Sequence, residues 1–241
     1  MHFSSWPSLI GIAVASYLIG SIASAVIVAR IFKLPDPRQA GSGNPGATNV
    51  LRLGGKKAAI FTLLGDLGKG LAPVLLLRAL GAPDEALAVA ALFAFIGHLF
   101  PIFFGFKGGK GVATAAGALL GLNPIIGGLA VGTWLLVAKI TRYSSAAAIA
   151  AAIMAALTSV YFGSPPILLA INLMSIALIY RHRQNIRRLL RGEEPRIGQK
   201  SHAKSHAKSH AKSHAKSHAK SNAPASPTSS QEASGQEESS Q

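Results

Sequence analysis

The stretch Gly41-Ser42-Gly43-Asn44-Pro45-Gly46-Ala47-Thr48-Asn49-Val50-Leu51-Arg52 separates two long apolar segments and carries glycines, a proline, small polar side chains and one guanidinium. Glycines permit positive φ angles and bring backbone N–H groups close to a ligand, and an adjacent arginine pairs with anionic oxygens. We call residues 41–52 the first glycine loop. A second glycine loop, Gly105-Phe106-Lys107-Gly108-Gly109-Lys110-Gly111, has the same character. We therefore expect the two loops to hold phosphate groups together at one face of a membrane.

Two nucleotide-binding motifs are alternatives for these loops. Three glycines of the first loop fit G-x-G-x-x-G, and Asp66 follows at the expected distance. That motif requires a preceding strand and a βαβ unit, whereas Pro35-Asp36-Pro37 precedes the loop and a membrane-like segment follows it. In the second loop Lys110 is followed by Gly111 rather than by Ser or Thr, so it does not match a Walker P-loop. The context argues against a nucleotide-binding fold.

The composition predicts a membrane protein. Of the 241 residues 49% are hydrophobic and 14% are charged, and about the last forty residues are wholly hydrophilic, so the apolar residues are concentrated before them. A lipid-facing exterior explains this distribution best. The absence of cysteine excludes disulfides, thiolate catalysis and cysteine-ligated metals.

The formal net charge of +15 would suggest nucleic acid as the partner of a soluble protein. Here the lysines and arginines gather at the ends of apolar segments and in the tail, as they do at the cytoplasmic face of membrane proteins. We therefore expect membrane lipids, and no nucleic acid, as partners.

Apolar segments at residues 9–32, 58–80, 86–104, 146–162 and 167–179 predict membrane-spanning helices. Residues 111–122 and 125–138 are shorter, and basic residues precede and follow the pair, so two passes or a re-entrant hairpin would satisfy the charge distribution. We predict an all-α polytopic protein with about seven transmembrane helices, the N-terminus outside and the C-terminus cytoplasmic. Only Arg78 falls on the outer side, where it could snorkel to the interface.

Asp66 and Lys69 interrupt the second apolar segment three residues apart, on one helix face. Each lowers the cost of burying the other. Two interpretations stay open: a structural ion pair, or a pair that places Lys69 at the edge of a phosphate site.

The chain ends in a segment unlike the rest, so we expect a membrane domain at residues 1–195 and a tail at residues 196–241. Ser-His-Ala-Lys occurs five times from Ser201 to Lys220, followed by a Ser/Gln/Glu/Pro-rich end. A period of four could align the histidines for metal binding, but the adjacent lysines repel a cation and there is nothing to bury. We favour a solvated basic arm that touches anionic lipid headgroups.

Four motifs together resemble those of the PlsY family, the bacterial acyl-phosphate:glycerol-3-phosphate acyltransferases. They are GSGNPGATNVLR with the following GGK, the D-x-x-K-G of residues 66–70, GHLFPIFFGFKGGKGVAT at residues 97–114 and RHRQNIRRLLRGEE at residues 181–194. The similarity covers roughly residues 8–195. It does not extend to the tail, whose function stays open.

The resemblance implies a multi-pass enzyme of the bacterial cytoplasmic (inner) membrane that acts in phospholipid synthesis. Such an enzyme moves a fatty acyl group from acyl phosphate to the 1-hydroxyl of sn-glycerol 3-phosphate, giving lysophosphatidate and phosphate. No cofactor, coenzyme A or metal is expected. The cationic loops fit two phosphorylated substrates, and charge stabilisation and orientation suit these residues better than carboxylate acid–base chemistry does.

Matching positions imply two groups of site residues. The catalytic group is Ser42, Arg52, His182 and Asn185, and the substrate-binding group is Asn44, Thr48, Asn49, Lys69, Lys107, Gly108, Gly109, Lys110 and Gly111. His182 and Asn185 are three apart, so they share a helix face; a headgroup-facing histidine is the alternative for His182. We expect a phosphate oxygen of a substrate to take the proton, with His182 orienting the hydroxyl.

Two other classes of function stay open on the residues alone. A membrane transporter for anions or sugar phosphates would also need many helices and cationic loops. Transporters usually show repeated halves with broken helices at the midplane, whereas the polar motifs here lie at one face and no internal repeat is visible. A membrane anchor for the basic tail would not need the glycine loops.

Overall fold

The computed structural model describes residues 3–199, and the Ser-His-Ala-Lys repeats therefore lie outside the described residues. Within that range the chain is helical, without a β-strand. The elements in chain order are α1 (Trp6–Gly20), α2 (Ser24–Ile31), α3 (Ala47–Ala79), α4 (Asp84–Leu99), the 3₁₀ turn η1 (Ile102–Phe104), α5 (Val112–Leu122), α6 (Pro124–Thr141), α7 (Ser144–Phe162), α8 (Pro165–Arg181) and α9 (Arg183–Leu190). The all-α prediction is confirmed.

Five helical segments of residues 3–199 are long and apolar enough to cross a membrane: Trp6–Ile31, Ala47–Ala79, Asp84–Phe104, Pro124–Thr141 and Ser144–Phe162. A sixth is α8 with α9, which bend by 54° at their junction. The polytopic class is thus confirmed, with five or six such segments against the expected seven. The orientation of the termini stays a prediction.

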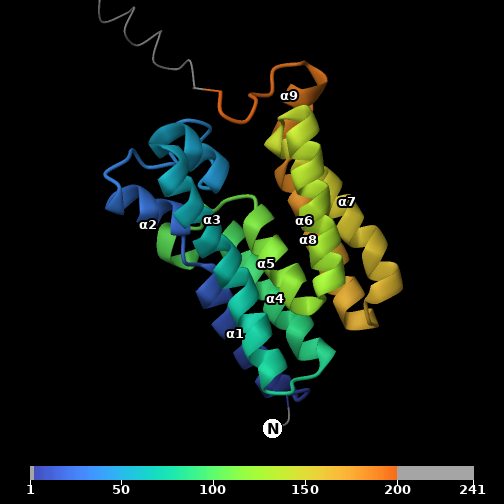
Figure 1. The fold of residues 1–241 in the computed structure, drawn as a ribbon. Coiled ribbons are helices and arrows are strands. Elements are labelled where there is room, and N and C mark those ends of the chain that lie inside the picture. The colour runs from blue at the N-terminus through green and yellow to red at the C-terminus, as the bar shows by residue number, and fades with distance from the viewer. Residues whose placement is uncertain (1–2, 200–241) are drawn as a thin grey trace, which may run out of the picture. The chain divides into compact units, whose positions relative to one another are not determined.

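The short helix α5 accounts for the difference. With 11 residues it extends about 16 Å, roughly half of a hydrocarbon core. Asn123 ends it: its Oδ1 accepts from Ile125 N at 2.9 Å to begin α6, and its Nδ2 donates to Phe162 O at 3.0 Å, at the end of α7. The two short apolar segments are therefore separate, closely packed helices joined by a tight turn (Figure 1).

Arg78 is exposed near the end of α3 and binds the end of α5. Its Nε donates to Gly121 O at 3.1 Å, and its Nη2 donates to Leu122 O, so it satisfies carbonyls at the C-terminal end of α5. These carbonyls have no intrahelical donor, and a cation at a helix C-terminus is favourable. That Arg78 snorkels to the outer interface stays a prediction.

Helices α3 and α5 approach closely through glycines. A Cβ on Gly70 would lie 2.1 Å from Thr114 O, and one on Gly117 would lie 2.0 Å from Leu67 O. Without hydrophobic drive inside a bilayer, such close backbone contact is what holds helices together. The core of buried side chains, including Phe95, Ile126 and Ile171, fills the space between α4 and its neighbours.

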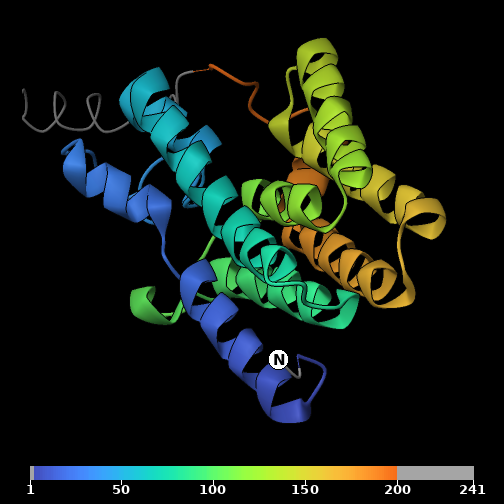
Figure 2. The same cartoon turned by 60° about the horizontal axis from the view of Figure 1, so that its bottom comes forward.

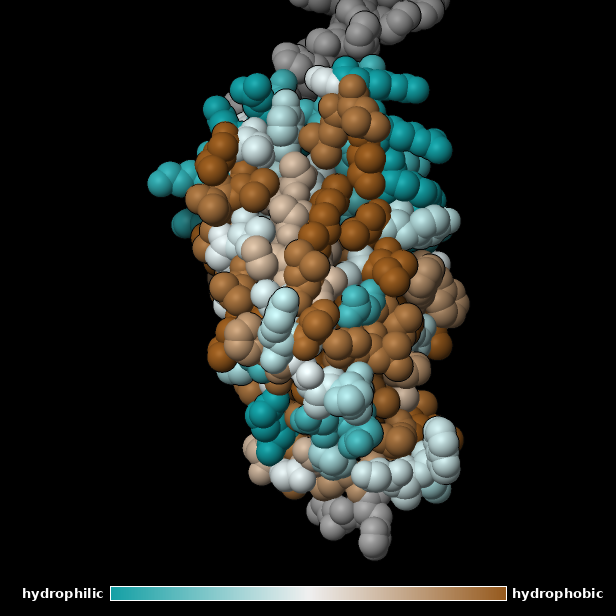
Figure 3. Space-filling model, turned by 90° about the vertical axis from the view of Figure 1, so that its right-hand side faces the viewer, coloured by the Kyte–Doolittle hydropathy of each residue, from teal (hydrophilic) through white to brown (hydrophobic). Residues whose placement is uncertain are grey.

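The surface divides by polarity. Apolar side chains cover the middle of the face in Figure 3, and hydrophilic side chains gather at its upper end. Leu135, Leu157 and Ile176 are among the large apolar residues exposed on α6, α7 and α8. Helices α2 and α9 and the start of α3 lie at one end of the bundle, and the start of α1 lies at the other (Figures 1 and 2). A lipid-facing belt with one strongly polar end follows.

Candidate active site

The fold brings the two glycine loops and the segment after α8 together. Arg38 Nη1 donates to Phe104 O at 3.2 Å, which ties the approach to the first loop to η1. A Cβ on Gly109 would lie 3.0 Å from Pro45 O, so the two loops touch. Arg181 Nη2 donates to Gly108 O at 3.1 Å and to Gly109 O at 2.9 Å. Three polar segments far apart in sequence therefore form one site at the polar end.

Asn49 holds the first glycine loop in shape. Its Oδ1 accepts from Ser42 N at 2.9 Å, and its Nδ2 donates to Pro37 O and Ala40 O at 2.9 Å each. Gly41 turns with φ +66° directly against this side chain, where a Cβ would lie 2.2 Å from Asn49 Oδ1. Both ends of the buried amide are thus bound by backbone groups of the loop and of the residues just before it.

The second glycine loop is fixed by its carbonyls and leaves N–H groups free. Gly109 N donates to His98 O at 3.2 Å, while the carbonyls of Gly108 and Gly109 accept from Arg181. Within residues 3–199 the N–H groups of Gly108, Lys110 and Gly111 have no assigned acceptor. Free N–H donors beside lysine make a cradle for an anion.

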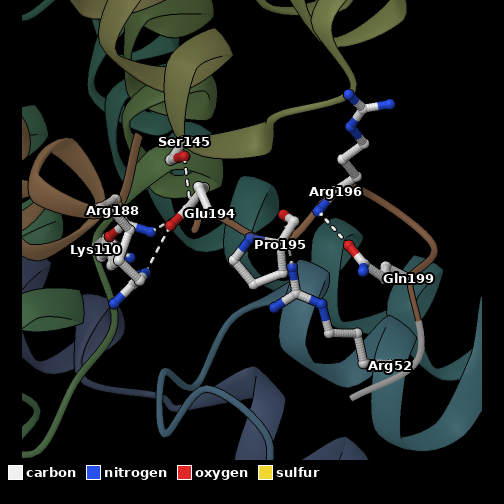
Figure 4. A network of polar contacts seen from close by, with 9 residues as sticks. Arg52, Lys110, Ser145, Arg188, Glu194, Pro195, Arg196 and Gln199 are labelled. Atoms are coloured by element: carbon white, nitrogen blue, oxygen red, sulfur yellow. Dashed lines mark hydrogen bonds and ion pairs between the residues drawn. The ribbon is translucent and has the colours of Figure 1, made fainter. Parts of the chain in front are cut away.

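Glu194 is the centre of a polar network that joins the second glycine loop, α7 and α9 (Figure 4). Its Oε1 accepts from Ser145 Oγ at 2.7 Å and from Asn185 Nδ2 at 2.6 Å, and its Oε2 accepts from Arg188 Nε at 2.7 Å. Lys110 Nζ donates to the other end of the same amide, Asn185 Oδ1. The amide of Asn185 therefore links the lysine of the second glycine loop to the buried carboxylate.

These contacts tune two ionisable groups in the loops outside the membrane-spanning helices. Burial opposes the charged form of Glu194, but its hydrogen bonds from Ser145, Asn185 and Arg188 outweigh burial and lower the pKa of this carboxyl. Burial lowers the pKa of Lys110 from 10.5 to about 8, with nearby Glu194 acting in the opposite direction. Lys110 is thus a cation that loses its proton just above neutral pH.

Arg52 is only weakly held by protein groups. Its Nη2 donates to Pro195 O at 3.4 Å, and its Nε is buried without a hydrogen-bond partner in the described part of the chain. Figure 4 shows the guanidinium directed at Pro195, next to the Glu194 network. A buried arginine donor without a partner requires an explanation, and an anionic oxygen is the partner that a guanidinium prefers.

His182 lies at the bend between α8 and α9 and is 3% exposed. Its Nδ1 is 2.8 Å from Leu178 O. Because a carbonyl only accepts, Nδ1 carries the proton, and the neutral imidazole keeps a lone pair on Nε2. His182 can therefore accept a hydrogen bond from a hydroxyl.

The site is cationic, with one buried carboxylate among several lysines and arginines, and no group of three His, Cys, Asp or Glu in residues 3–199 is arranged to hold a metal ion. Its chemistry is thus that of an anion-binding site. A family model described as glycerol-3-phosphate acyltransferase matches residues 10–192. The chain belongs to the glycerol-3-phosphate acyltransferase family.

Relatives and a solved structure agree with this family. Glycerol-3-phosphate acyltransferase of Paraburkholderia phytofirmans is 55% identical over 197 residues, covering 80% of this chain and 92% of the relative. That of Methylococcus capsulatus is 54% identical over 186 residues, covering 77% and 94%. The crystal structure of PlsY (YgiH), an integral membrane glycerol 3-phosphate acyltransferase, in its glycerol 3-phosphate form has a TM-score of 0.75 and 39% identity, covering 79% of this chain and 96% of that one. Its lysophosphatidic acid form has a TM-score of 0.73.

The predicted site residues differ in their exposure and in the protein groups that they bind. Ser42 is exposed and Asn44 is half-buried, and neither side chain has an assigned hydrogen bond in residues 3–199. Thr48 Oγ1 lies 3.0 Å from Ser144 Oγ at the start of α7, whereas Asn49 is used within its own loop. The remaining predicted residues at the polar end are Arg52, Lys107, Gly108, Gly109, Lys110, Gly111, His182 and Asn185.

Lys69 lies beneath the second glycine loop. Its Nζ is 2.9 Å from Asp66 Oδ1 and donates to Ile22 O at 2.7 Å. The ion pair that the three-residue spacing suggests is therefore present. Both side chains are buried, so the ammonium is already occupied by protein groups.

Sequence reasoning missed Glu194, the centre of the network, and other contributors to the site. Ser145 reaches Glu194 from the start of α7, Arg188 does so from α9, and His98 lies against Gly109. Ser145 follows an arginine–tyrosine–serine turn that carries no motif. His98 could have been singled out from the sequence, because it stands among apolar residues ten positions before Gly108. A histidine buried in such a segment requires a structural or functional explanation.

Proposed function

We propose that the protein transfers a fatty acyl group from acyl phosphate to the 1-hydroxyl of sn-glycerol 3-phosphate in the bacterial cytoplasmic membrane, releasing lysophosphatidate and phosphate. The cationic site formed by two glycine loops at the polar end of a lipid-embedded bundle carries this proposal. One substrate carries an apolar acyl chain and both carry a phosphate group, so they would meet where apolar and cationic surfaces adjoin. The crystal forms named above, one with glycerol 3-phosphate and one with lysophosphatidic acid, concern a protein similar to this one.

The chain offers two sets of anion-binding groups. The free N–H groups of the second glycine loop, with Lys107 and Lys110, would bind the phosphoryl group that leaves. Arg52, with Ser42, Asn44 and Thr48 of the first loop, would bind glycerol 3-phosphate. Asn49 would contribute by holding the shape of the first loop rather than by contacting the substrate.

In the transfer itself the 1-hydroxyl oxygen attacks the acyl carbonyl carbon. A C–O ester bond forms, and the bond from the carbonyl carbon to the phosphate oxygen breaks. The hydroxyl proton passes to a phosphate oxygen, so phosphate leaves protonated. His182 Nε2 would accept the hydrogen bond that orients the hydroxyl, and Lys110 and the loop N–H groups would stabilise the negative charge on the leaving group.

An assay of purified protein tests the proposal. Palmitoyl phosphate with glycerol 3-phosphate should release phosphate and form lysophosphatidate, and palmitoyl-coenzyme A should not replace the acyl donor. A transporter of anions or sugar phosphates would move glycerol 3-phosphate into vesicles without forming product. Transport without product would refute the proposal in favour of that alternative.

A substitution tests whether the group that takes the hydroxyl proton belongs to a substrate or to the protein. His182→Ala should lower turnover partly, because a substrate oxygen takes the proton. If His182→Ala abolished turnover while substrate binding stayed intact, a protein base would be the better account.

A topology experiment tests the placement of the loops. The chain lacks cysteine, so single cysteines at positions 43, 83 and 108 can be labelled from either side of the membrane. Positions 43 and 108 should react from the cytoplasmic side, and position 83 from the other. Loops on opposite sides would rule out a shared site.

A further inference from the structure

Three buried ionisable side chains lie below the second glycine loop and belong to neither set of phosphate-binding groups. Asp66, Lys69 and His98 are 2%, 6% and 6% exposed. Charged groups at this depth are costly and are retained for a reason. They form one cluster: Asp66 Oδ1 is 2.9 Å from Lys69 Nζ and 3.5 Å from His98 Nδ1.

The cluster contacts the break between α1 and α2 and lies against both glycine loops. Lys69 Nζ donates at 2.7 Å to Ile22 O, the carbonyl between α1 and α2. A small cavity of about 10 Å³ beside the cluster is lined also by Ala23, Pro45, Pro101, Gly108 and Gly109. The three side chains therefore lie together beneath the α1–α2 break, the first glycine loop and the second glycine loop.

His98 contacts the second loop directly. Its carbonyl accepts from Gly109 N at 3.2 Å, and its imidazole fills the space where a Cβ of Gly109 would be, 2.3 Å from Nε2. On the other side Arg181 holds the carbonyls of Gly108 and Gly109. The Gly108–Gly109 peptide is thus clamped between an arginine above and a histidine below.

We propose that Asp66, Lys69 and His98 are positioning residues for the transfer reaction: together they set the height and orientation of the Gly108–Gly109 turn, and so of the free N–H groups that bind the phosphoryl group. Asp66 Oδ1 lies 3.5 Å from the imidazole Nδ1, close enough for attraction but without a hydrogen bond between them, and Lys69 holds Asp66 against the α1–α2 break. None of the three touches substrate. The inference rests on the proposed function.

A pair of double variants tests the clamp. Gly109→Ala should abolish most activity because its Cβ collides with His98 Nε2. Since His98→Ala removes that atom, Gly109→Ala should cost much less activity in the His98→Ala background, a non-additive result typical of direct contact. Gly108→Ala is the matched control: its Cβ meets His98 O at 2.0 Å, a backbone atom that His98→Ala leaves in place, so its cost should stay the same in both backgrounds.

A charge-free variant tests the positioning role without an unpaired buried charge. Asp66→Asn with Lys69→Met removes both charges and should keep the melting temperature in detergent. Its kcat/KM for acyl phosphate should fall by about 10- to 100-fold, mainly through KM, because the loop donors are misplaced. Wild-type kinetic constants in this variant, or equal relief of Gly108→Ala and Gly109→Ala by His98→Ala, would overturn the inference. An inactive wild-type protein would instead reject the proposed function.

Discussion

Lys110 is expected to limit the activity of this protein at alkaline pH. Burial lowers the pKa of Lys110 from 10.5 to about 8, a shift that corresponds to about 3 kcal/mol against the charged form. The lysine must be protonated to stabilise phosphate. At pH 9 about one-tenth of the free protein would carry the charge, whereas a lysine with an ordinary pKa would stay almost fully charged.

The expected dependence on pH differs between kcat/KM and kcat. The value of kcat/KM reports the free protein and should fall about tenfold per pH unit above pH 8. Bound phosphate adds negative charge beside Lys110 and raises its pKa in the complex, so kcat should decline only at higher pH. Phosphate release from palmitoyl phosphate between pH 6 and pH 10, corrected for hydrolysis without protein, measures both.

Lys110→Arg is the matched variant. A guanidinium keeps its charge throughout this range but lacks the geometry of the ammonium, so activity should be lower and the decline above pH 8 should disappear. The reasoning is refuted if Lys110→Arg declines with the same midpoint as the wild type, or if the wild-type kcat/KM is constant to pH 10.

Three further substitutions separate binding from stability. Arg52→Ala should lower kcat/KM by about 100-fold with an unchanged melting temperature, because the one hydrogen bond assigned to Arg52 in residues 3–199 is a long contact of 3.4 Å; wild-type rates would remove Arg52 from the site. Asn49→Ala should lower the free energy of unfolding by about 3 kcal/mol, since three hydrogen bonds are lost, and protease should then cut the first glycine loop; an unchanged unfolding curve in denaturant would contradict this role. The pKa of Glu194 is lowered, so the ionised carboxylate stabilises the folded protein above its ordinary pKa of 4.5, and this stabilisation is lost as the pH falls through the lowered pKa. The melting temperature of Glu194→Gln should therefore lack this loss at acid pH. Equal profiles of melting temperature against pH for the two proteins would disprove this role.

The local features of the fold were predictable from the sequence. Apolar segments, glycine loops and basic flanks each depend on neighbouring residues, so residues 105–111 were correctly predicted as a loop between apolar helices. The first glycine loop was predicted to extend to residue 52, whereas α3 already begins at Ala47, so its last six residues are helical. The bounds of α5 agree with the predicted segment 111–122, whereas the contacts at its end, Asn123 with Phe162 O and Arg78 with carbonyls of α5, were not predictable.

The partners within the site were not predictable in the same way. Asn49 fits the sequence pattern of a ligand contact, yet its amide is consumed by backbone groups of residues 37, 40 and 42. Lys69 was open between two interpretations, and the carbonyl of Ile22 that it binds comes from a helix break 47 residues earlier. Glu194 gave no sign that Ser145 and Asn185 would surround it.

The sequence by itself determined that this chain is helical, embedded in lipid and cationic at one face, because hydropathy, glycine content and charge act over a few neighbouring residues. Tertiary structure alone decided which cation is free to bind and which is occupied, as the contrast of Arg52 with Lys69 shows. The physical reason is that hydrogen bonds and desolvation depend on atoms within about 4 Å. Helix packing, and not chain order, brings those atoms together.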